Sequence, residues 1–271
     1  MEPNWSITQV GDGVSPLIIH VPHAATGIPA YVRRGLGVDD PTVTDILANM
    51  TDWYTDRLAL DALALSGVPA SVFTNGLSRL VVDPERFTGD DEPMQAVGMG
   101  PVYHASYDGR PLRPDDPEGD RHLLERYFRP YSAAFADLVD RTLVAVGRAV
   151  IVDLHSFPSR PLPYEADQSA PRPGVCVGTD PFHTSVGLRA AAAGRFAALG
   201  HGVDEDTPFA GTYVPLHHLH RTGAVTSVMI EVRRDLYQEE PGGPIHDGYR
   251  RVVQALGHFL VEAIVADFPG N

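Results

Sequence analysis

The feature that most constrains this fold is the alternation of short, almost continuous apolar runs with longer stretches of helical period. The first run, residues 17–21, consists of Leu-Ile-Ile-His-Val and is stopped by Pro22. A run of this length and composition is typical of a strand buried on both faces. Further runs of this kind are at residues 68–74, 79–83, 149–154, 174–178 and 225–232.

Segments with helical spacing of apolar residues separate these runs. The first begins with Asp40 as N-cap and Pro41 at the first helical position, and it extends to about Ser66-Gly67. Residues 119–147 form a second, which we expect to bend at Arg129-Pro130 because proline lacks a backbone N–H. Two more helices are expected at residues 181–199 and 245–268.

This alternation predicts an α/β fold: a three-layer sandwich with a central mixed, largely parallel sheet covered by helices on both sides. Residues 88–119 are rich in Gly, Pro and Asp without a clear period, which indicates a long surface loop, and a loop of that length is usually functional or mobile. We find no internal repeat and no linker that would divide the chain. A single catalytic domain over residues 1–271 is therefore expected.

Composition excludes several classes of partner and site. The formal net charge of -14 argues against nucleic acid or an anionic membrane as a partner. The single cysteine, Cys176, excludes a disulfide framework or a site with several thiolates, and its apolar neighbours predict a buried core thiol. No secretory signal or membrane-spanning run is present, so a soluble cytoplasmic protein is expected. The sequence does not specify an oligomeric state.

Histidines stand at the carboxyl ends of two predicted strands. His23 comes directly after Val21-Pro22, and His155 ends the run at 149–154. Ligands of open α/β sheets bind beyond these strand ends. Asp153 is two residues before His155 and on the same side of the strand, where it can accept a hydrogen bond from an imidazole. Hydrogen-bonded turn caps and a zinc site, which usually has three protein ligands and a water, both remain open.

A third ligand could come from a polar stripe on the predicted helix at 40–66. The stripe consists of Asp45, Asn49, Asp52 and Asp56. It is either the solvated face of an amphipathic helix or a concentration of negative charge that a divalent cation compensates. The second possibility is favoured by the presence of only one nearby cation, Arg57, because like charges four residues apart are mildly destabilising. Spacing does not select one carboxylate from the stripe.

Glu231 interrupts a run, residues 228–232, that otherwise has the composition of a core strand. A buried carboxylate is costly unless it is paired or protonated. Arg233, two residues later and on the same face, offers a structural ion pair. The functional alternative is a general base that takes a proton from water and passes it to a leaving nitrogen.

Two arginines stand at either end of the predicted strand at 79–83, and three histidines precede the last strand. Arg79 and Arg86 would suit an anionic substrate, because guanidinium matches carboxylate in bidentate geometry. Ordinary pairing with Asp83 or Glu85 is equally compatible with the pattern. The loop at 209–220 adds His217, His218 and His220, which are compatible with surface, substrate-binding or metal-binding roles.

In their order and spacing, these segments resemble the N-formylglutamate amidohydrolase (deformylase) family. The resemblance spans about residues 17–240, most of the chain. The matching segments are Val21-Pro22-His23; Thr51-Asp52-Trp53 with Asp56; Ser78-Arg79 through Asp83 to Arg86; Val152-Asp153-Leu154-His155-Ser156; Phe209-Ala210-Gly211 to His217; and Ile230-Glu231-Val232.

The resemblance implies a fold similar to zinc carboxypeptidases and to deacylases of N-acyl amino acids. It implies hydrolysis of N-formyl-L-glutamate, a small anionic substrate, to formate and L-glutamate in histidine catabolism. It also selects Asp52 from the polar stripe. The implied roles are Zn²⁺ ligands for His23, Asp52 and His155, general base for Glu231, and substrate contacts for Arg79, Arg86 and His217.

The chain departs from the family at Glu85, where asparagine is common. A carboxylate there would disfavour a substrate carboxylate unless Glu85 points away or pairs with Arg79. The nearest alternative function is therefore a deacylase or peptidase-like amidohydrolase for a different N-acyl amino acid. An alternative of another class is a metal-free protein of the same fold that binds a small molecule.

Overall fold

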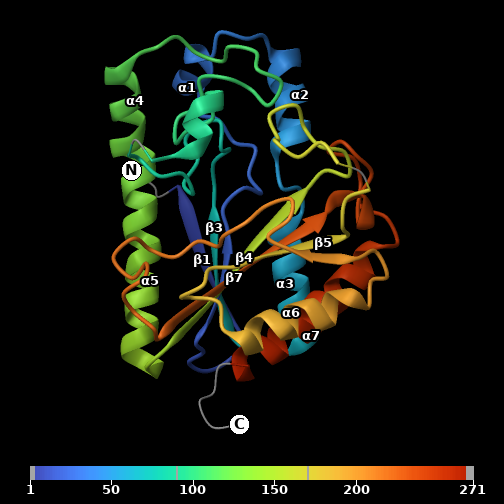
Figure 1. Cartoon of the computed structure of the whole chain (residues 1–271). Coiled ribbons are helices and arrows are strands. Elements are labelled where there is room, and N and C mark those ends of the chain that lie inside the picture. The colour runs from blue at the N-terminus through green and yellow to red at the C-terminus, as the bar shows by residue number, and fades with distance from the viewer. Residues whose placement is uncertain (1–3, 90, 170, 267–271) are drawn as a thin grey trace.

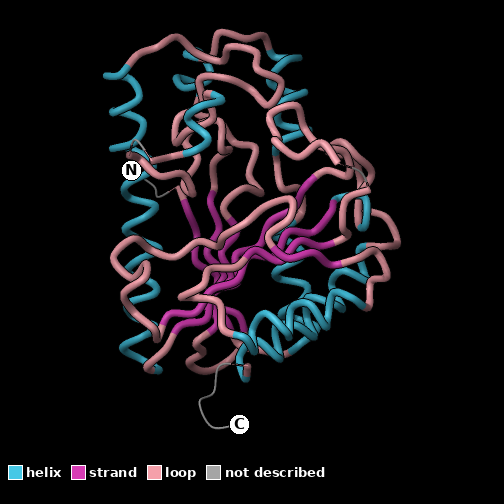
Figure 2. Tube along the Cα trace, viewed as in Figure 1, coloured by secondary structure: helices cyan, strands magenta, loops and turns pink. Residues whose placement is uncertain are grey.

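A central mixed sheet of seven strands organises the chain in the computed structural model, which describes residues 4–89, 91–169 and 171–266 (Figures 1 and 2). The strand order is β1-β3-β2-β4-β7-β5-β6. Strands β3, β2, β4 and β7 are parallel to one another, whereas β1 and the pair β5–β6 run in the opposite direction. The strands are β1 (Trp5–Val10), β2 (Leu17–Val21), β3 (Ala70–Asn75), β4 (Ala149–Phe157), β5 (Val175–Gly178), β6 (Val203–Glu205) and β7 (Val225–Arg233).

Helices cover both faces of this sheet. Figure 1 shows α5 (Arg129–Val146) alone on one side, and α3 (Thr55–Ser66), α6 (Val186–Ala197) and α7 (Tyr249–Val265) together on the other. The predicted three-layer α/β sandwich with a largely parallel sheet is confirmed. No helix within the described ranges is long and apolar enough to cross a membrane.

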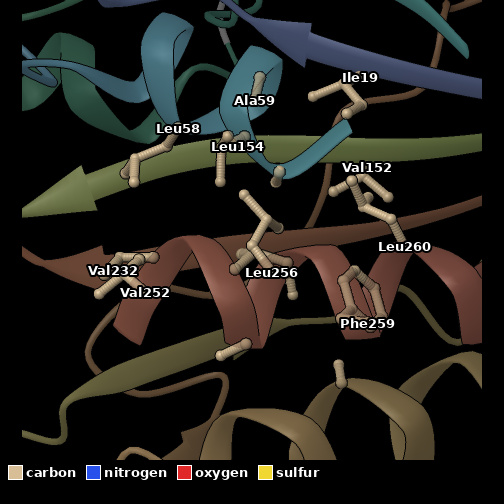
Figure 3. Packing of buried hydrophobic residues seen from close by; sticks show 14 of the residues in the cluster. Ile19, Leu58, Ala59, Val152, Leu154, Val232, Val252, Leu256, Phe259 and Leu260 are labelled. Atoms are coloured by element: carbon tan, nitrogen blue, oxygen red, sulfur yellow. The ribbon is translucent and has the colours of Figure 1, made fainter. Parts of the chain in front are cut away.

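Alternation along the buried strands explains why their sequences are apolar at nearly every position. In β2, Leu17 and Ile19 belong to the core that packs against α3 and α7, whereas Ile18 between them packs into the core beneath α5. Figure 3 shows the first of these cores, where Ile19 and Val152 of the sheet face Leu256 and neighbouring residues of α7. Strands β2 and β4 are therefore packed against helices on both faces of the sheet.

A cap of shorter elements covers the end of the sheet at which β2, β4 and β7 finish (Figure 1). It contains α1 (Ala30–Gly35), α2 (Asp40–Met50) and the 3-10 helix η1 (Pro93–Val97). The expectation of an irregular surface loop at 88–119 was wrong in part, because Met99, Tyr103 and Leu112 are buried and form a small core with α2. The segment at 79–83 is not a strand: its apolar residues pack into the cap, and turns replace sheet hydrogen bonds.

The helix expected at 40–66 is two helices, α2 and α3. Asp39 rather than Asp40 is the N-cap of α2, since its side chain accepts a hydrogen bond from Thr42 N. The helix breaks after Met50 because the backbone that follows hydrogen-bonds to a neighbouring segment. The N–H of Asp52 donates to the carbonyl of His23 at 3.0 Å. Tyr54 then adopts a left-handed conformation, φ 64°, before α3 begins.

The remaining differences concern element boundaries. The stretch at 119–147 consists of α4 (Pro117–Leu123), a π-helical turn η2 (Leu124–Phe128) and α5, so the irregularity comes directly before Arg129-Pro130. The last helix begins at Tyr249, and residues 267 and 268 of its expected range lie outside the described residues. The edge strands β1 and β6 were not predicted. Cys176 is buried in β5, as expected, with its Sγ 3.0 Å from the carbonyl of Phe209.

Candidate active site

Three side chains converge at the carboxyl ends of the central strands. His23 follows β2, His155 lies near the end of β4, and Asp52 lies in the break between α2 and α3. The Nδ1 atoms of the two histidines are 3.3 Å apart, and Asp52 Oδ2 is 3.1 Å from His155 Nδ1 and 3.7 Å from His23 Nδ1. All three side chains are buried. The structure therefore brings together the three residues expected to form a metal site.

The separations of these three atoms suit a tetrahedral zinc ion. Zinc ligands lie about 2.0–2.1 Å from the metal, which places any two of them roughly 3.3 Å apart at tetrahedral angles. The observed distances of 3.1, 3.3 and 3.7 Å bracket that value. Two imidazole nitrogens and one carboxylate oxygen are also a donor set that zinc binds in catalytic sites, with a further position left for water or substrate. The residues present thus fit the ion.

Each of the two histidines also faces a carboxylate with its other nitrogen. His23 Nε2 lies 2.9 Å from Asp83 Oδ1, and His155 Nε2 lies 3.1 Å from Asp153 Oδ1. Such outer carboxylates orient a ligating imidazole and select its tautomer. Burial alone would lower the pKa of His155, but the carboxylates of Glu85 and Asp153 outweigh it and raise that pKa well above its ordinary value. The same negative charge attracts a cation.

Asp83 is itself held in place by hydrogen bonds, of which the two shortest to Oδ2 come from Tyr103 and Arg79. Tyr103 Oη donates to its Oδ2 at 2.6 Å, and Arg79 Nη2 donates to the same oxygen at 2.8 Å. Burial would raise the pKa of Asp83, but the guanidinium groups of Arg79 and Arg86 hold it well below its ordinary range. Asp83 is therefore a charged carboxylate that fixes His23, a role that its proximity to two arginines in the sequence did not reveal.

Arg234 holds the second oxygen of Asp52. Its guanidinium donates to Asp52 Oδ1 at 3.0 Å and to the Ser156 hydroxyl and carbonyl at 3.1 and 2.9 Å. Burial would raise the pKa of Asp52, yet hydrogen bonds from His155 and His23 lower it far below its ordinary value. Sequence reasoning missed Arg234. Its position three residues after the buried Glu231 was the available signal.

Glu231 stands beside this group on the adjacent strand, where its Cα pairs with that of His155 in the parallel β4–β7 register. Its Oε2 is buried and has no hydrogen-bond partner among the described residues. Burial raises the pKa of Glu231 to about 8, against the opposing effect of His155. The structural ion pair considered for Arg233 does not form, because that guanidinium bonds to Asp235 at 2.7 Å and extends to the Arg172 carbonyl.

A cavity of about 260 Å³ contains the three converging residues and Glu231. Its volume is close to the lower end of the roughly 300–1,000 Å³ typical of small-molecule pockets. Arg79, Arg86 and Arg234 line the cavity. Arg79 and Arg234 donate hydrogen bonds to Asp83 and Asp52, whereas Arg86 Nε lies 3.6 Å from Asp83 Oδ2 and is buried without a hydrogen-bond partner among the described residues. Arg86 is therefore the arginine best placed to receive a new anion.

Glu85 points into the site and does not pair with Arg79. Its Oε2 lies 3.2 Å from His155 Nε2, and its Oε1 lies 3.4 Å from His20 Nδ1. Burial and Asp153 raise the pKa of Glu85, but the neighbouring histidines outweigh them and lower it. With His20 and Asp153, Glu85 forms a second group whose ligand atoms lie close enough for a metal. Both ring nitrogens of His20 already form hydrogen bonds: Nδ1 with Asp153 Oδ1 at 2.8 Å and Nε2 with Tyr131 Oη at 2.7 Å.

The structure does not bring His217 into the cavity. Its Nε2 lies 3.2 Å from Asp140 Oδ1, and the neighbouring His218 Nε2 lies 2.9 Å from the same oxygen. These three side chains form a separate cluster, largely exposed, beside α5. His220 pairs instead with Asp180 at 2.8 Å. Of the residues expected to contact substrate, Arg79 and Arg86 line the cavity, and His217 lines a neighbouring hollow.

Comparison with solved structures shows the same fold in two bacterial proteins. An N-formylglutamate amidohydrolase from Ralstonia eutropha JMP134 superposes with a TM-score of 0.79, at 21% identity, over 98% of each chain. A gene product of Agrobacterium tumefaciens superposes with a TM-score of 0.68, at 18% identity, over 97% of this chain and 94% of its own. Comparison with curated proteins gives no match.

Comparison of the sequence with models of protein families identifies the family. The model of the N-formylglutamate amidohydrolase family matches residues 15–238, which contain β2, β4, β7 and every residue of the site described above. The resemblance noted from the sequence is thereby confirmed, and with it the expectation of an enzyme that hydrolyses an amide. This chain belongs to the N-formylglutamate amidohydrolase family.

Proposed function

We propose that this protein is a zinc-dependent amidohydrolase that removes the acyl group of an N-acyl acidic amino acid. N-formyl-L-glutamate, which gives formate and L-glutamate, is the substrate that the family name indicates. One observation carries the proposal: two histidine nitrogens and a carboxylate oxygen converge beside a buried glutamate without a partner, in a cavity lined by arginines.

His23, Asp52 and His155 would hold the zinc ion. When bound, zinc supplies Lewis acidity, which polarises a carbonyl and lowers the pKa of a water molecule. Asp83, Asp153 and Arg234 lie beside the remaining polar atoms of these side chains and would keep them oriented.

Glu231 would move the protons of the reaction. Its unpartnered Oε2 faces the same cavity, where it can accept a proton from the attacking water and return it to the departing nitrogen. Arg86 would bind a carboxylate of the amino acid, since its Nε is free of other hydrogen bonds among the described residues. Arg79 supports this wall through Asp83. His217 could meet the substrate only if the substrate reaches the neighbouring hollow.

Two measurements on protein purified without chelator test this function. We expect about one zinc ion per chain and release of formate from N-formyl-L-glutamate, with acetyl and succinyl analogues assayed beside it. Hydrolysis of another N-acyl amino acid alone would assign the same chemistry to a different substrate. Absence of zinc, together with no activity on zinc addition, would overturn the proposal in favour of a metal-free binding protein.

A further inference from the structure

A second hollow, of about 670 Å³, opens beside the catalytic cavity. The two share four lining residues, Glu85, Arg86, Ala210 and Met229. Met229 lies on β7 two residues before Glu231, so the shared boundary is next to the reacting groups. A molecule bound at the catalytic centre would therefore meet the hollow at this shared boundary.

The walls of the hollow are largely apolar. They come from α5, from the segment after Glu85 and from the loop at 209–220. Two of its apolar side chains are strongly exposed, Phe87 at 43% and Leu216 at 63%. Large apolar side chains gathered at the edge of a concave surface are typical of a binding site that an apolar ligand covers.

Charge determines which end of an N-acyl amino acid would enter the hollow. Its lining contains four carboxylates, Glu85, Glu92, Asp153 and Asp180, and one arginine, Arg86. The catalytic cavity is lined by three arginines and three carboxylates, Asp52, Glu85 and Glu231, so its lining is less negative than that of the hollow. The carboxylates of the amino acid are thus favoured in the catalytic cavity and repelled from the hollow. An uncharged, apolar group is the occupant that the hollow favours.

Glu85 strengthens this orientation because it stands at the boundary. Its carboxylate is directed at His155 and His20, and it lines both spaces. An anionic group passing this point would meet a fixed negative charge, whereas a methylene chain would not. The departure from the family at this position therefore acts on the acyl side of the substrate.

We propose that the hollow holds an apolar acyl chain of several carbons, so that the preferred substrates are N-acyl acidic amino acids with acyl groups longer than formyl. This inference rests on the proposed function. The reaction is unchanged in kind: the oxygen of water bonds to the acyl carbon, the carbon–nitrogen bond breaks, and the protons of water pass to the amine. The products are a fatty acid of medium length and the free amino acid.

The test is the acyl-chain dependence of kcat/KM for the zinc-loaded protein on N-formyl-, N-acetyl-, N-hexanoyl- and N-octanoyl-L-glutamate. A fully buried methylene contributes roughly a fourfold gain. We expect kcat/KM to rise at least about tenfold from acetyl to octanoyl, since burial along the chain is partial. A value that is flat or falls with chain length overturns the proposal.

Substitutions on α5 test whether the hollow causes the dependence of kcat/KM on acyl-chain length. Ala136→Phe would fill the hollow from its α5 wall, and it should lower the octanoyl-to-acetyl ratio of kcat/KM at least about fivefold, close to the loss of one buried methylene. Ala145→Phe places the same side chain on an exposed part of the same helix and should leave the ratio unchanged. Equal ratios in the two variants would contradict the assignment.

Measurement of dissociation constants distinguishes a failure of this inference from a failure of the proposed function. The dissociation constants of N-formyl- and N-octanoyl-L-glutamate would be measured by calorimetry on the zinc-loaded Glu231→Gln variant, in which turnover is suppressed. Tighter binding of the octanoyl compound supports the hollow, and equal constants overturn it. If wild-type protein hydrolyses none of the four compounds, the proposed function fails, and the dissociation constants still decide the hollow.

Discussion

Each side chain that faces the candidate metal position has a charged neighbour beside its other polar atom. Asp83 holds His23, Asp153 lies against His155, and Arg234 binds the remaining oxygen of Asp52. Glu231 differs, because its Oε2 has no partner among the described residues. Glu85 Oε1 also has no hydrogen-bond partner among the described residues, but its carboxylate lies against His155 and His20. Glu231 is therefore the carboxylate that we propose to exchange a proton.

We predict that Glu231→Gln lowers kcat by about 10²–10⁴-fold while the zinc content stays near one ion per chain. The substitution keeps the shape of the side chain and removes its ability to accept a proton. Formate or acid release measures the first quantity, and metal analysis of the purified variant measures the second.

The matched control is Asp235→Asn, which removes an exposed carboxylate four residues away whose partner is Arg233. It should retain wild-type kcat. A Glu231→Gln variant with near wild-type turnover would show that another group transfers the proton.

The placement of a residue in the cavity was predictable where a polar side chain interrupts an apolar strand, as at His155 and Glu231. They were not predictable where the partner depends on tertiary contacts. Strand alternation placed Arg233 beside Glu231, yet its long side chain reaches Asp235 instead, and the next residue, Arg234, turns into the site. Selection of Asp52 required the family resemblance, because the break that removes it from the polar stripe depends on a bond to His23.

At the scale of elements, the turn between β5 and α6 is stabilised by one carboxylate. Asp180 accepts hydrogen bonds from the backbone N–H groups of Phe182 and His183, at 2.8 and 2.9 Å, and faces the ring of His220. Burial would raise the pKa of Asp180, but the hydrogen bond with the His220 side chain and those from the two backbone groups outweigh it and lower that pKa below its ordinary value. The turn is thus tied to a charged side chain.

We predict that Asp180→Ala lowers the free energy of unfolding by about 1 kcal/mol at pH 7. Because the folded pKa is lowered, the contribution of Asp180 is fully present above the unfolded pKa of about 3.9 and is lost as the pH falls through the folded value. The difference between wild type and variant should therefore shrink below about pH 4. Urea unfolding at several pH values measures it.

Asp137→Ala, on the exposed face of α5, serves as the comparison and should stay within about 0.5 kcal/mol of wild type at every pH. A pH-independent difference for Asp180→Ala would mean that its charge does not stabilise the turn.

Elements were predicted best where burial is complete. The runs that became β2, β4 and β7 are apolar because both faces are covered, whereas the edge strands β1 and β6 lack such a signal. The segment at 79–83 has the composition of a buried strand but packs into the cap, since an apolar run specifies burial and not its hydrogen-bond partners.

At the scale of the whole molecule, the candidate metal ligands come from segments far apart in the chain: His23, Asp52 and His155 are assembled only when the sheet and cap have formed. An unfolded chain cannot present them together. Metal binding should therefore stabilise the folded state by mass action.

We predict that zinc at about 100 times its dissociation constant stabilises the protein by about 2.7 kcal/mol, which raises the Tm by roughly 5–10 °C. Chelation should reverse the shift. Differential scanning fluorimetry with and without chelator measures it.

His155→Ala removes one of the three proposed ligands and should abolish the zinc-dependent part of the Tm shift. A shift of equal size in this variant would place the stabilising ion elsewhere, for example at the cluster of Asp140, His217 and His218.

The register that pairs His155 with Glu231 restricts how this protein can diverge. Side chains alternate with a period of two, so one inserted or deleted residue in β4 or β7 would turn Glu231 away from the histidine and separate acid–base chemistry from the metal position. Changes of length in the loop at 211–220, which lines the second hollow, would leave this register untouched. On the proposed function, such changes would alter the acyl specificity and leave the residues of the hydrolytic centre in place.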